Sequence, residues 1–491
     1  MNQADVKKIL EMGVLLSSEQ NLDYLLEHIL QSIMELARCD AGTLYLLEDG
    51  ALHFKIMRND TLNTYSGGHG PAPNLPPVPL GRENVCALAL IEDRVIRIED
   101  VKNCKEYDFS GPIRYDALTG YNTRSMLVAP MRNREGEQIG VIQLINAMDG
   151  SGRVCEFPEE LALVVESAAS QAAITIQNAR YVEEIRELFR SFVRVMSSAV
   201  EERTPYNSNH TKNMAKYGGR FIDYLNRQAD QAGKPIPFSP DHRDELLMSV
   251  WLHDIGKLVT PLEVMNKEAR LLPEQHKDFL HRMEIIRLRT EIDCLSGRIS
   301  AGERDSLIRQ TWQAIELVEH ANKARFVPDD YLVELDNLAK LTYTGEDGQS
   351  YPWLTQDEQA MLSIRKGTLS DGERKIMEEH VSFTGKLLSK IHFSKELSHV
   401  PQWASYHHEF LNGNGYPNHL IGDAIPYEVR IITILDIFDA LVAIDRPYKP
   451  GMPVDQALDV LQSMAEQEGK LDPELTRQFC QSRCWEENEP T

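Results

Sequence analysis

The sequence has few basic residues for its length. Its 491 residues include 52 Lys and Arg against 75 Asp and Glu, which gives a formal net charge of −23. A chain this acidic repels a phosphate backbone, which argues against a general nucleic-acid-binding protein. An anionic substrate would have to be held by a few locally placed cations. At ~100–200 residues per domain, the length predicts two to four domains.

Cysteines and long apolar runs are also scarce. The seven cysteines are scattered and form no CxxC pair, which is typical of a protein in the reducing cytoplasm. The most apolar stretches, 161–176 and 431–444, are interrupted by polar residues well short of the ~20 apolar residues of a membrane-spanning helix. Residues 1–5 include no basic region followed by an apolar core, so we expect no secretory signal. These absences predict a cytoplasmic protein without a membrane segment.

The first half has the pattern of an α/β domain, an antiparallel sheet flanked by helices. Apolar residues at helical spacing predict a helix over 9–37. Short apolar runs between turn residues predict strands at 42–47, 51–56, 94–98, 125–129 and 138–145, with hairpin turns at 48–50 and 133–136. Helical periodicity then continues from just after Pro158 to about Val200 without Pro or Gly, which indicates a connecting rod and a dimer seam.

The second half has an almost entirely helical pattern. Helices are expected at 372–391, 403–408, 429–444 and 454–467, and a charged, mainly helical stretch occupies 272–368. From its length and charge, we interpret this stretch as a helical lid or partner surface. The predicted division of the chain is an α/β domain at 1–180, a connecting helix at 181–203 and a helical domain at 204–485.

The second half also contains a set of candidate metal ligands. His253 and Asp254 follow an apolar run, and neighbouring residues of one turn can both reach a metal cluster. Alone, this pair is more often a capped helix end. Asp436 and Asp439 lie one turn apart on an otherwise apolar helix, where burying an unpaired carboxylate is costly. Counting further histidines, five imidazoles and two carboxylates would suffice for two divalent cations.

Several motifs together resemble the HD-GYP family. They are His253-Asp254, His407-His408, Gly413-Asn-Gly-Tyr-Pro417 and Asp439-Ala-Leu441 followed by Asp445-Arg-Pro-Tyr-Lys449. The resemblance implies an all-α HD-superfamily domain that hydrolyses cyclic di-GMP to linear pGpG, with further hydrolysis to GMP left open. It implies two divalent metal ions, iron or manganese, held by His210, His253, Asp254, His380, His407, His408 and Asp436.

The same resemblance assigns roles to other residues. Asp254 would bridge the metals, and Lys257 would contact a phosphate oxygen or the nucleophile. Asp439 would hydrogen-bond to a ligand, and the substrate phosphates would be held by Tyr416, Arg446 and Lys449. A subset of the family with three metals has Glu where this chain has Tyr206, so we expect two. The 272–368 stretch has no counterpart in a minimal domain of this family and is therefore an insertion.

The first half resembles a GAF domain, most closely those that bind cAMP or cGMP in phosphodiesterases and cyclases. The resemblance rests on residues 116–131, 139–146 and 157–160, in which Asn146 and Phe157 match the motif that supports the ligand pocket. Ala147 stands where those domains have Lys. If a nucleotide binds, the pocket residues would be Thr119, Thr123 and Asn146. The alternatives are another small molecule or a GAF domain used for dimerisation.

The sequence therefore predicts a homodimeric cyclic-dinucleotide phosphodiesterase regulated by its GAF domain. Hydrolysis of 3′,3′-cGAMP instead of cyclic di-GMP is one alternative, because no residue of the sequence is identified that would distinguish a guanine base from an adenine base. A catalytically silent cyclic-dinucleotide receptor is a second alternative, although the complete ligand set argues against it. A third is another HD-superfamily enzyme, such as a nucleoside triphosphohydrolase or a (p)ppGpp hydrolase, which the His-His pair and the Gly-Tyr-Pro loop argue against.

Overall fold

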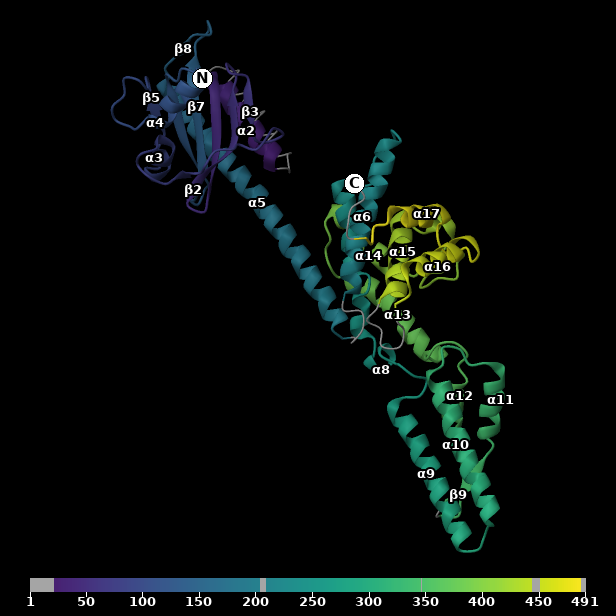
Figure 1. Ribbon diagram of the computed structural model, residues 1–491. Coiled ribbons are helices and arrows are strands. Elements are labelled where there is room, and N and C mark those ends of the chain that lie inside the picture. The colour runs from purple at the N-terminus through teal and green to yellow at the C-terminus, as the bar shows by residue number, and fades with distance from the viewer. Residues whose placement is uncertain (1–21, 204–208, 346, 444–450, 487–491) are drawn as a thin grey trace. The chain divides into compact units, whose positions relative to one another are not determined.

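The computed structural model describes residues 22–203, 209–345, 347–443 and 451–486. The chain divides into two compact units, residues 1–189 and residues 190–491 (Figure 1). None of the helices in the described ranges combines the length and the apolar content that crossing a bilayer requires.

The first unit contains an antiparallel sheet in the strand order β3-β2-β1-β7-β6-β5, with β4 paired to β2 and β8 paired to β7. The strands and helices predicted over this half are confirmed; of the helix expected at 9–37, residues 9–21 lie outside the described ranges. The elements are α2 (Leu22–Ala37), β1 (Cys39–Glu48), β2 (Ala51–Asn59), β3 (Thr64–Ser66), β4 (Val78–Pro79), α3 (Val85–Ile91), β5 (Ile96–Ile98), α4 (Ser110–Thr119), β6 (Met126–Arg132), β7 (Gln138–Met148), β8 (Val154–Cys155) and α5 (Glu159–Glu201).

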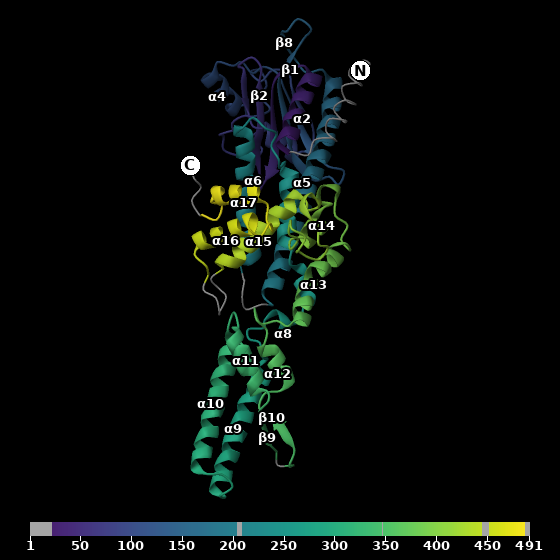
Figure 2. The ribbon, with the colours of Figure 1, turned by 90° about the vertical axis from the view of Figure 1, so that its right-hand side faces the viewer.

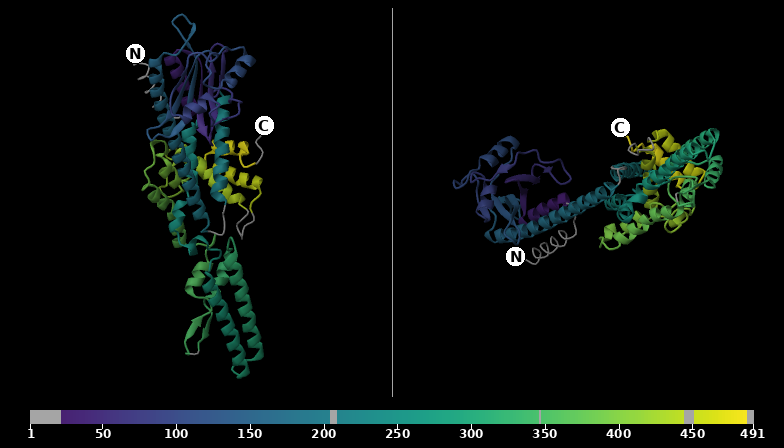
Figure 3. Two further views of the ribbon diagram at one scale, coloured as in Figure 1. Left: turned by 90° about the vertical axis from the view of Figure 1, so that its left-hand side faces the viewer. Right: turned by 90° about the horizontal axis from the view of Figure 1, so that it is seen from below.

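The sheet is covered on both faces. One face packs against α2 and the first turns of α5, through a core that includes Ile29, Leu44 and Ala169 (Figures 2 and 3). The other face packs against α3, through a second core that includes Leu88 and the sheet residue Val141. The β1–β2 hairpin turns at Asp49 and Gly50, both at positive φ, which is the conformation that a two-residue hairpin loop requires.

The second unit is helical, as predicted, apart from one short hairpin. Its elements are α6 (His210–Gln231), α7 (Pro240–Leu252), η1 (Ile255–Val259), α8 (Leu262–Met265), α9 (Pro273–Leu295), α10 (Ala301–Lys323), α11 (Asp329–Leu338), β9 (Thr342–Thr344), β10 (Ser350–Pro352), α12 (Gln356–Leu362), α13 (Asp371–Leu388), η2 (Lys395–Leu397), α14 (Val400–Ser405), η3 (Gly422–Ala424), α15 (Tyr427–Val442), α16 (Val454–Glu466) and α17 (Pro473–Ser482). The β9–β10 pair was not expected, and α14 ends three residues earlier than the predicted helix.

Two separate cores stabilise this unit. The first lies among α6, α7, α15, α16 and α17 and includes Phe221, Phe438 and Phe479. The second lies inside the insertion, where α9 and α10 run side by side and pack with α11 and α12 around Phe279 and Val318 (Figures 1 and 2). The insertion therefore has an apolar core of its own, beside the core that positions the candidate site.

Candidate active site

The candidate site begins where α7 ends. The helix starts at Pro240, capped by Ser239, whose hydroxyl accepts the His242 N–H. It stops at Leu252, His253 caps its C-terminus, and Asp254 precedes the short helix η1. His253 is fully buried and the Asp254 side chain is only 13% exposed, so both point into the unit rather than to solvent.

A close contact joins this turn to α13. The Thr384 hydroxyl, fully buried on α13, accepts the Gly256 N–H at 3.0 Å and donates to the His253 carbonyl at 3.0 Å. A Cβ at position 256 would lie 1.9 Å from the His380 carbonyl oxygen, so this position requires glycine. The contact places His380, one turn before Thr384, directly beside the turn that contains Asp254.

Three imidazoles have the same local arrangement. The Nδ1 atoms of His253, His380 and His407 lie 2.7, 2.6 and 2.7 Å from the backbone carbonyls of the residues three positions earlier. A proton on Nδ1 satisfies each carbonyl and leaves the lone pair on Nε2. All three Nε2 atoms are buried and have no hydrogen-bond partner in the described structure. A buried ring nitrogen with an unpaired lone pair is a suitable ligand atom for a metal ion.

These three nitrogens converge on Asp254. The distances from Nε2 to the nearer carboxylate oxygen are 3.3 Å for His253, 3.4 Å for His380 and 4.0 Å for His407. Asp254 Oδ1 is itself buried without a hydrogen-bond partner, whereas Oδ2 pairs with Lys257 Nζ at 2.5 Å. One carboxylate therefore lies between the imidazoles and a lysine, in a position to bridge two cations.

Burial and charge set the protonation of this group. Burial lowers the pKa of His380 to about 4, against the opposing effect of Asp254. Burial, and then the neighbouring His408, holds the pKa of His407 well below its usual range. Burial alone would raise the pKa of Asp254, but Lys257 and the imidazoles lower it well below its usual range. His380 and His407 are therefore neutral imidazoles and Asp254 is an ionised carboxylate, the forms that bind metals.

A second group lies beside the first. His210, the first residue of α6, has Nδ1 at 2.7 Å from Asp439 Oδ2 and Nε2 at 3.2 Å from Asp436 Oδ1. His408 Nδ1 lies 3.6 Å from Asp436 Oδ2. Asp439 thus contacts the ring nitrogen of His210 that faces away from Asp436. Burial would lower the pKa of His210, but the two carboxylates raise it to about 10.

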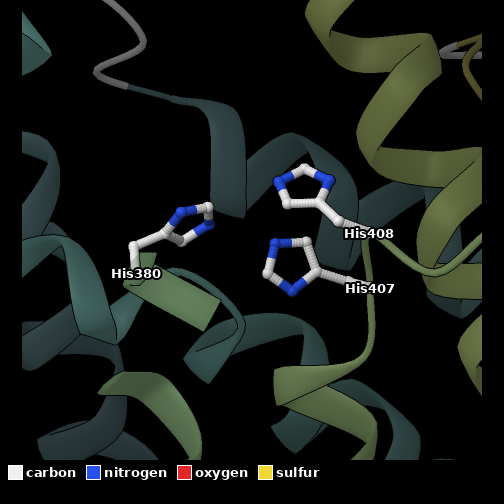
Figure 4. Close-up of side chains that lie close together, drawn as sticks. All are labelled: His380, His407 and His408. Atoms are coloured by element: carbon white, nitrogen blue, oxygen red, sulfur yellow. The ribbon is translucent and has the colours of Figure 1, made fainter. Parts of the chain in front are cut away.

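The sequence-predicted residues therefore lie together. His380, His407 and His408 form one group whose ring nitrogens lie within 4.8 Å of one another, and His210, His253 and Asp254 form another. Figure 4 shows the first group, with His380 on α13 and the other two on the segment after α14. Five imidazoles and two carboxylates, without a thiolate, fit a pair of divalent cations.

The candidate substrate residues are placed only in part. The Tyr416 ring lies 4.8 Å from the His408 ring, and burial raises the Tyr416 pKa. Its loop folds back on His408, because the Tyr416 N–H donates to the His408 carbonyl. Arg446 and Lys449 lie outside the described residues. So does Tyr206, on which the expectation of two rather than three metals depends.

The sequence analysis missed side chains that hold the backbone of the site. Glu409, 2% exposed, accepts the N–H groups of Asn418 and Leu420 and so closes the loop that contains Tyr416. Thr433 on α15 donates to the His407 carbonyl at 2.8 Å, as Thr384 does to His253. The sequence did contain a pattern that could have identified Thr384 and Thr433: each is a polar residue one helical turn from a candidate ligand.

In the first unit, the predicted pocket residues hydrogen-bond within the domain. Asn146 Oδ1 accepts the Arg124 N–H, and its Nδ2 lies 3.0 Å from the Tyr121 hydroxyl. The Thr123 hydroxyl, 1% exposed, donates to an Asp116 carboxylate oxygen. Thr119 is exposed and donates to the Tyr115 carbonyl. The Thr119 hydroxyl oxygen also accepts the N–H of Tyr121, whose own hydroxyl contacts Asn146; the role of the three residues in ligand binding stays a prediction.

Comparison with known families assigns both halves of the chain. Residues 21–176 match the family model of the GAF domain, and residues 357–475 match that of the HD domain. The HD-domain match begins inside the insertion, so it includes His380 but neither His253 nor Asp254. The structure brings these two residues to the matched region, since both contact α13 or its histidine. The chain therefore carries a GAF domain followed by an HD domain.

Curated relatives share parts of this sequence. The chain is 39% identical over 110 residues to 3′3′-cGAMP-specific phosphodiesterase 3 of Vibrio cholerae, covering 22% of this chain and 23% of that protein. It is 38% identical over 111 residues to the cyclic di-GMP phosphodiesterase response regulator RpfG of Xanthomonas campestris, covering 22% and 28%. It is 36% identical over 92 residues to dual 3′,5′-cyclic-AMP and -GMP phosphodiesterase 11A of Takifugu rubripes, covering 18% and 10%. The chain thus spans about a quarter or less of each of these relatives.

Proposed function

We propose that this protein is a metal-dependent phosphodiesterase that hydrolyses cyclic di-GMP to linear pGpG. The observation that carries the proposal is the set of three buried imidazoles whose Nε2 atoms have no partner and converge on Asp254. The names of the Vibrio cholerae and Xanthomonas campestris relatives supply the substrate class, since these are a 3′3′-cGAMP-specific and a cyclic di-GMP phosphodiesterase.

The residues that would hold the metals are the seven expected from the sequence. Asp254 would bridge them, and its pairing with Lys257 would keep that lysine beside the site. The ligands are His210, His253, Asp254, His380, His407, His408 and Asp436. Once bound, two divalent cations supply a nucleophile at neutral pH and stabilise charge that develops on the phosphate.

The protein's own side chains would then orient the substrate. Lys257 would contact a phosphate oxygen, and Tyr416 would contact the substrate from the loop that Glu409 closes. Asp439 would fix the ring of His210 through Nδ1. In such a site the phosphodiester would contact cationic groups in a unit that is otherwise acidic. These local cations would allow a protein with a large net negative charge to bind an anionic substrate.

Three finer features belong to the same proposal. Iron or manganese would occupy the site, as the resemblance to the HD-GYP family implies, and imidazole and carboxylate ligands are compatible with either metal. The protein would act in the cytoplasm, where its seven free cysteines would stay reduced. The GAF domain would bind a small molecule, with a cyclic nucleotide suggested by Asn146 and Phe157, which match the motif of cyclic-nucleotide-binding GAF domains.

We also propose a homodimer formed through α5. Five of its exposed apolar side chains alternate at spacings of four and three residues, which is the repeat of a two-stranded coiled coil. They are Tyr181, Ile185, Leu188, Phe192 and Val195. A monomer in light scattering at micromolar concentration would overturn this part of the proposal.

The test is anaerobic hydrolysis by the full chain loaded with Fe(II) or Mn(II). Cyclic di-GMP and 3′,3′-cGAMP are supplied separately, and linear products are followed by chromatography. We expect product with cyclic di-GMP, none from Asp254→Ala, and unchanged turnover from Asp230→Ala, an exposed aspartate in the same unit. Faster turnover of 3′,3′-cGAMP would change the substrate. Tight binding of cyclic di-GMP by metal-loaded protein without product would identify a receptor instead.

A further inference from the structure

Helix α9 of the insertion is apolar on two opposite faces. One face, with Phe279, Met283 and Ile286, is buried in the core of the insertion. The other face is exposed: Ile285, Leu288, Ile292 and Leu295 are 45%, 58%, 55% and 86% accessible. At about 100° per residue these two sets lie on opposite sides of the helix. In Figures 1 and 2, α9 lies along one side of the long hairpin that it forms with α10.

A helix packed on one side needs one apolar stripe, so the exposed stripe calls for another partner. The four residues follow one another at spacings of three, four and three, which is the a and d pattern of a heptad repeat. Isoleucine occupies both a positions, 285 and 292, and leucine both d positions, 288 and 295. Ile at a with Leu at d is the combination that favours two-stranded parallel coiled coils.

The charges beside the stripe fit the same arrangement. The g positions are Glu284 and Glu291, and the e position between the two heptads is Arg289. In a parallel pair, Glu284 of one helix faces Arg289 of the other, whose guanidinium also donates to the Thr344 carbonyl of its own chain. In an antiparallel pair, g positions face each other, so Glu284 would lie opposite Glu291, and like charges would repel. The stripe therefore complements a parallel copy of itself.

We propose that the exposed stripe of α9 forms a parallel two-stranded coiled-coil contact with α9 of a second copy of this chain. The contact is isologous, since each residue meets its own counterpart across a two-fold axis. The helix is already held by the core of the insertion, so little ordering entropy opposes association. Two heptads bury less than the ~1,200–2,000 Å² of a standard interface, so the contact alone is weak. A second dimer contact elsewhere in the chain would strengthen it by raising the effective concentration.

Disulfide trapping in the full chain tests the register. Leu288→Cys and Leu295→Cys each place a thiol at a d position, where a parallel pair brings identical residues together. Gln313→Cys, exposed on α10 of the same hairpin, is the control. After mild oxidation, we expect mass spectrometry to find a peptide in which residue 288 is linked to residue 288, a bond that must join two chains. Cross-linking no faster than at position 313 would overturn the proposal, as would bonds only between different positions.

A second experiment separates this contact from dimerisation through α5. Leu288→Glu combined with Ile292→Glu puts charges into the stripe, and both side chains are more than half exposed, so folding is unaffected. We expect the dissociation constant from sedimentation to rise about tenfold or more, and the Leu295→Cys cross-link to disappear. Val333→Glu, an equally exposed apolar position on α11, should change neither. If the cross-link persists at the wild-type rate in the double variant, a different surface causes it. The outcome does not depend on phosphodiesterase activity.

Discussion

Replacing Thr384 with valine is expected to loosen the candidate site without changing its ligands. Valine has nearly the same shape but cannot accept the Gly256 N–H or donate to the His253 carbonyl. Both backbone groups would remain buried without that partner, and each unsatisfied group costs about 1–3 kcal/mol, so we expect the free energy of unfolding to fall by about 2–6 kcal/mol. At about 2 °C per kcal/mol for a unit of this size, the midpoint of thermal unfolding should fall by about 4–12 °C.

The Thr384→Val substitution should lower turnover by more than its loss of folding stability alone would cause. The two hydrogen bonds hold Asp254 beside His380, and a misplacement of about 1 Å can lower turnover about 100-fold. The assay is calorimetry of the full chain with and without Mn²⁺, together with metal content and kcat. The transition that shifts with Mn²⁺ identifies the HD domain.

Two variants make this test specific. Thr384→Ser keeps the hydroxyl and should recover most of the metal content and turnover. Thr290→Val removes a buried hydroxyl that bonds only within its own helix, to the Ile286 carbonyl, and should leave both unchanged. Wild-type metal content and turnover in Thr384→Val would refute the reasoning, as would a serine variant no better than valine.

Three further predictions follow from the second unit. Gly256→Ala should lose metal and activity together, because its Cβ would lie 1.9 Å from the His380 carbonyl oxygen; retained metal by elemental analysis would contradict this. Chelation by EDTA should lower the HD-domain transition in calorimetry, because a metal that binds only the folded state stabilises it, and leave any other transition in place. Glu358→Gln should destabilise the insertion by about 3 kcal/mol at pH 7, since it breaks a buried pair with Arg282. Burial opposes but Arg282 lowers the Glu358 pKa, so this stabilisation is present above the unfolded pKa of about 4.3 and is lost as pH falls through the folded value. Urea unfolding should therefore show the difference closing below about pH 4, while the exposed capping glutamate of α10, in Glu303→Gln, should show a smaller effect throughout.

Local patterns explain why much of the fold could be predicted from the sequence. The β1–β2 hairpin turns at Asp49 and Gly50, a residue pair that favours the required positive φ wherever it occurs. Helix α5 was predicted from periodicity alone, because no Pro or Gly interrupts it. The β9–β10 hairpin was missed because its strands, Thr342–Thr344 and Ser350–Pro352, are too short to produce a recognisable alternation.

The candidate site was predictable in its residue types but not in what holds them. His253, His380 and His407 stand in recognisable motifs, and the structure brings them together; their role as ligands stays a prediction. Thr384 and Thr433 were not recognised, because a threonine in an apolar helix is unremarkable until its contact is known. Each bonds a backbone carbonyl of a segment distant in the sequence, 131 and 26 residues away. Such pairings depend on tertiary structure, which one-dimensional spacing does not contain.

The base of the insertion explains how a site can be assembled from segments that the insertion separates. Arg270, fully buried just before α9, donates to the Ala321 and Ala324 carbonyls at the end of α10 and to the Ile364 carbonyl after α12. Just outside it, Lys267 pairs with Glu373 at 2.7 Å, across the two ends of the insertion. Because these contacts bring entry and exit together, the length of the intervening chain adds little to the entropic cost of closing the loop. The turn with Asp254 can then pack on α13 as if the two were neighbours in sequence. The insertion is thereby free to carry a surface of its own, such as the exposed face of α9, without altering the spacing of the candidate ligands.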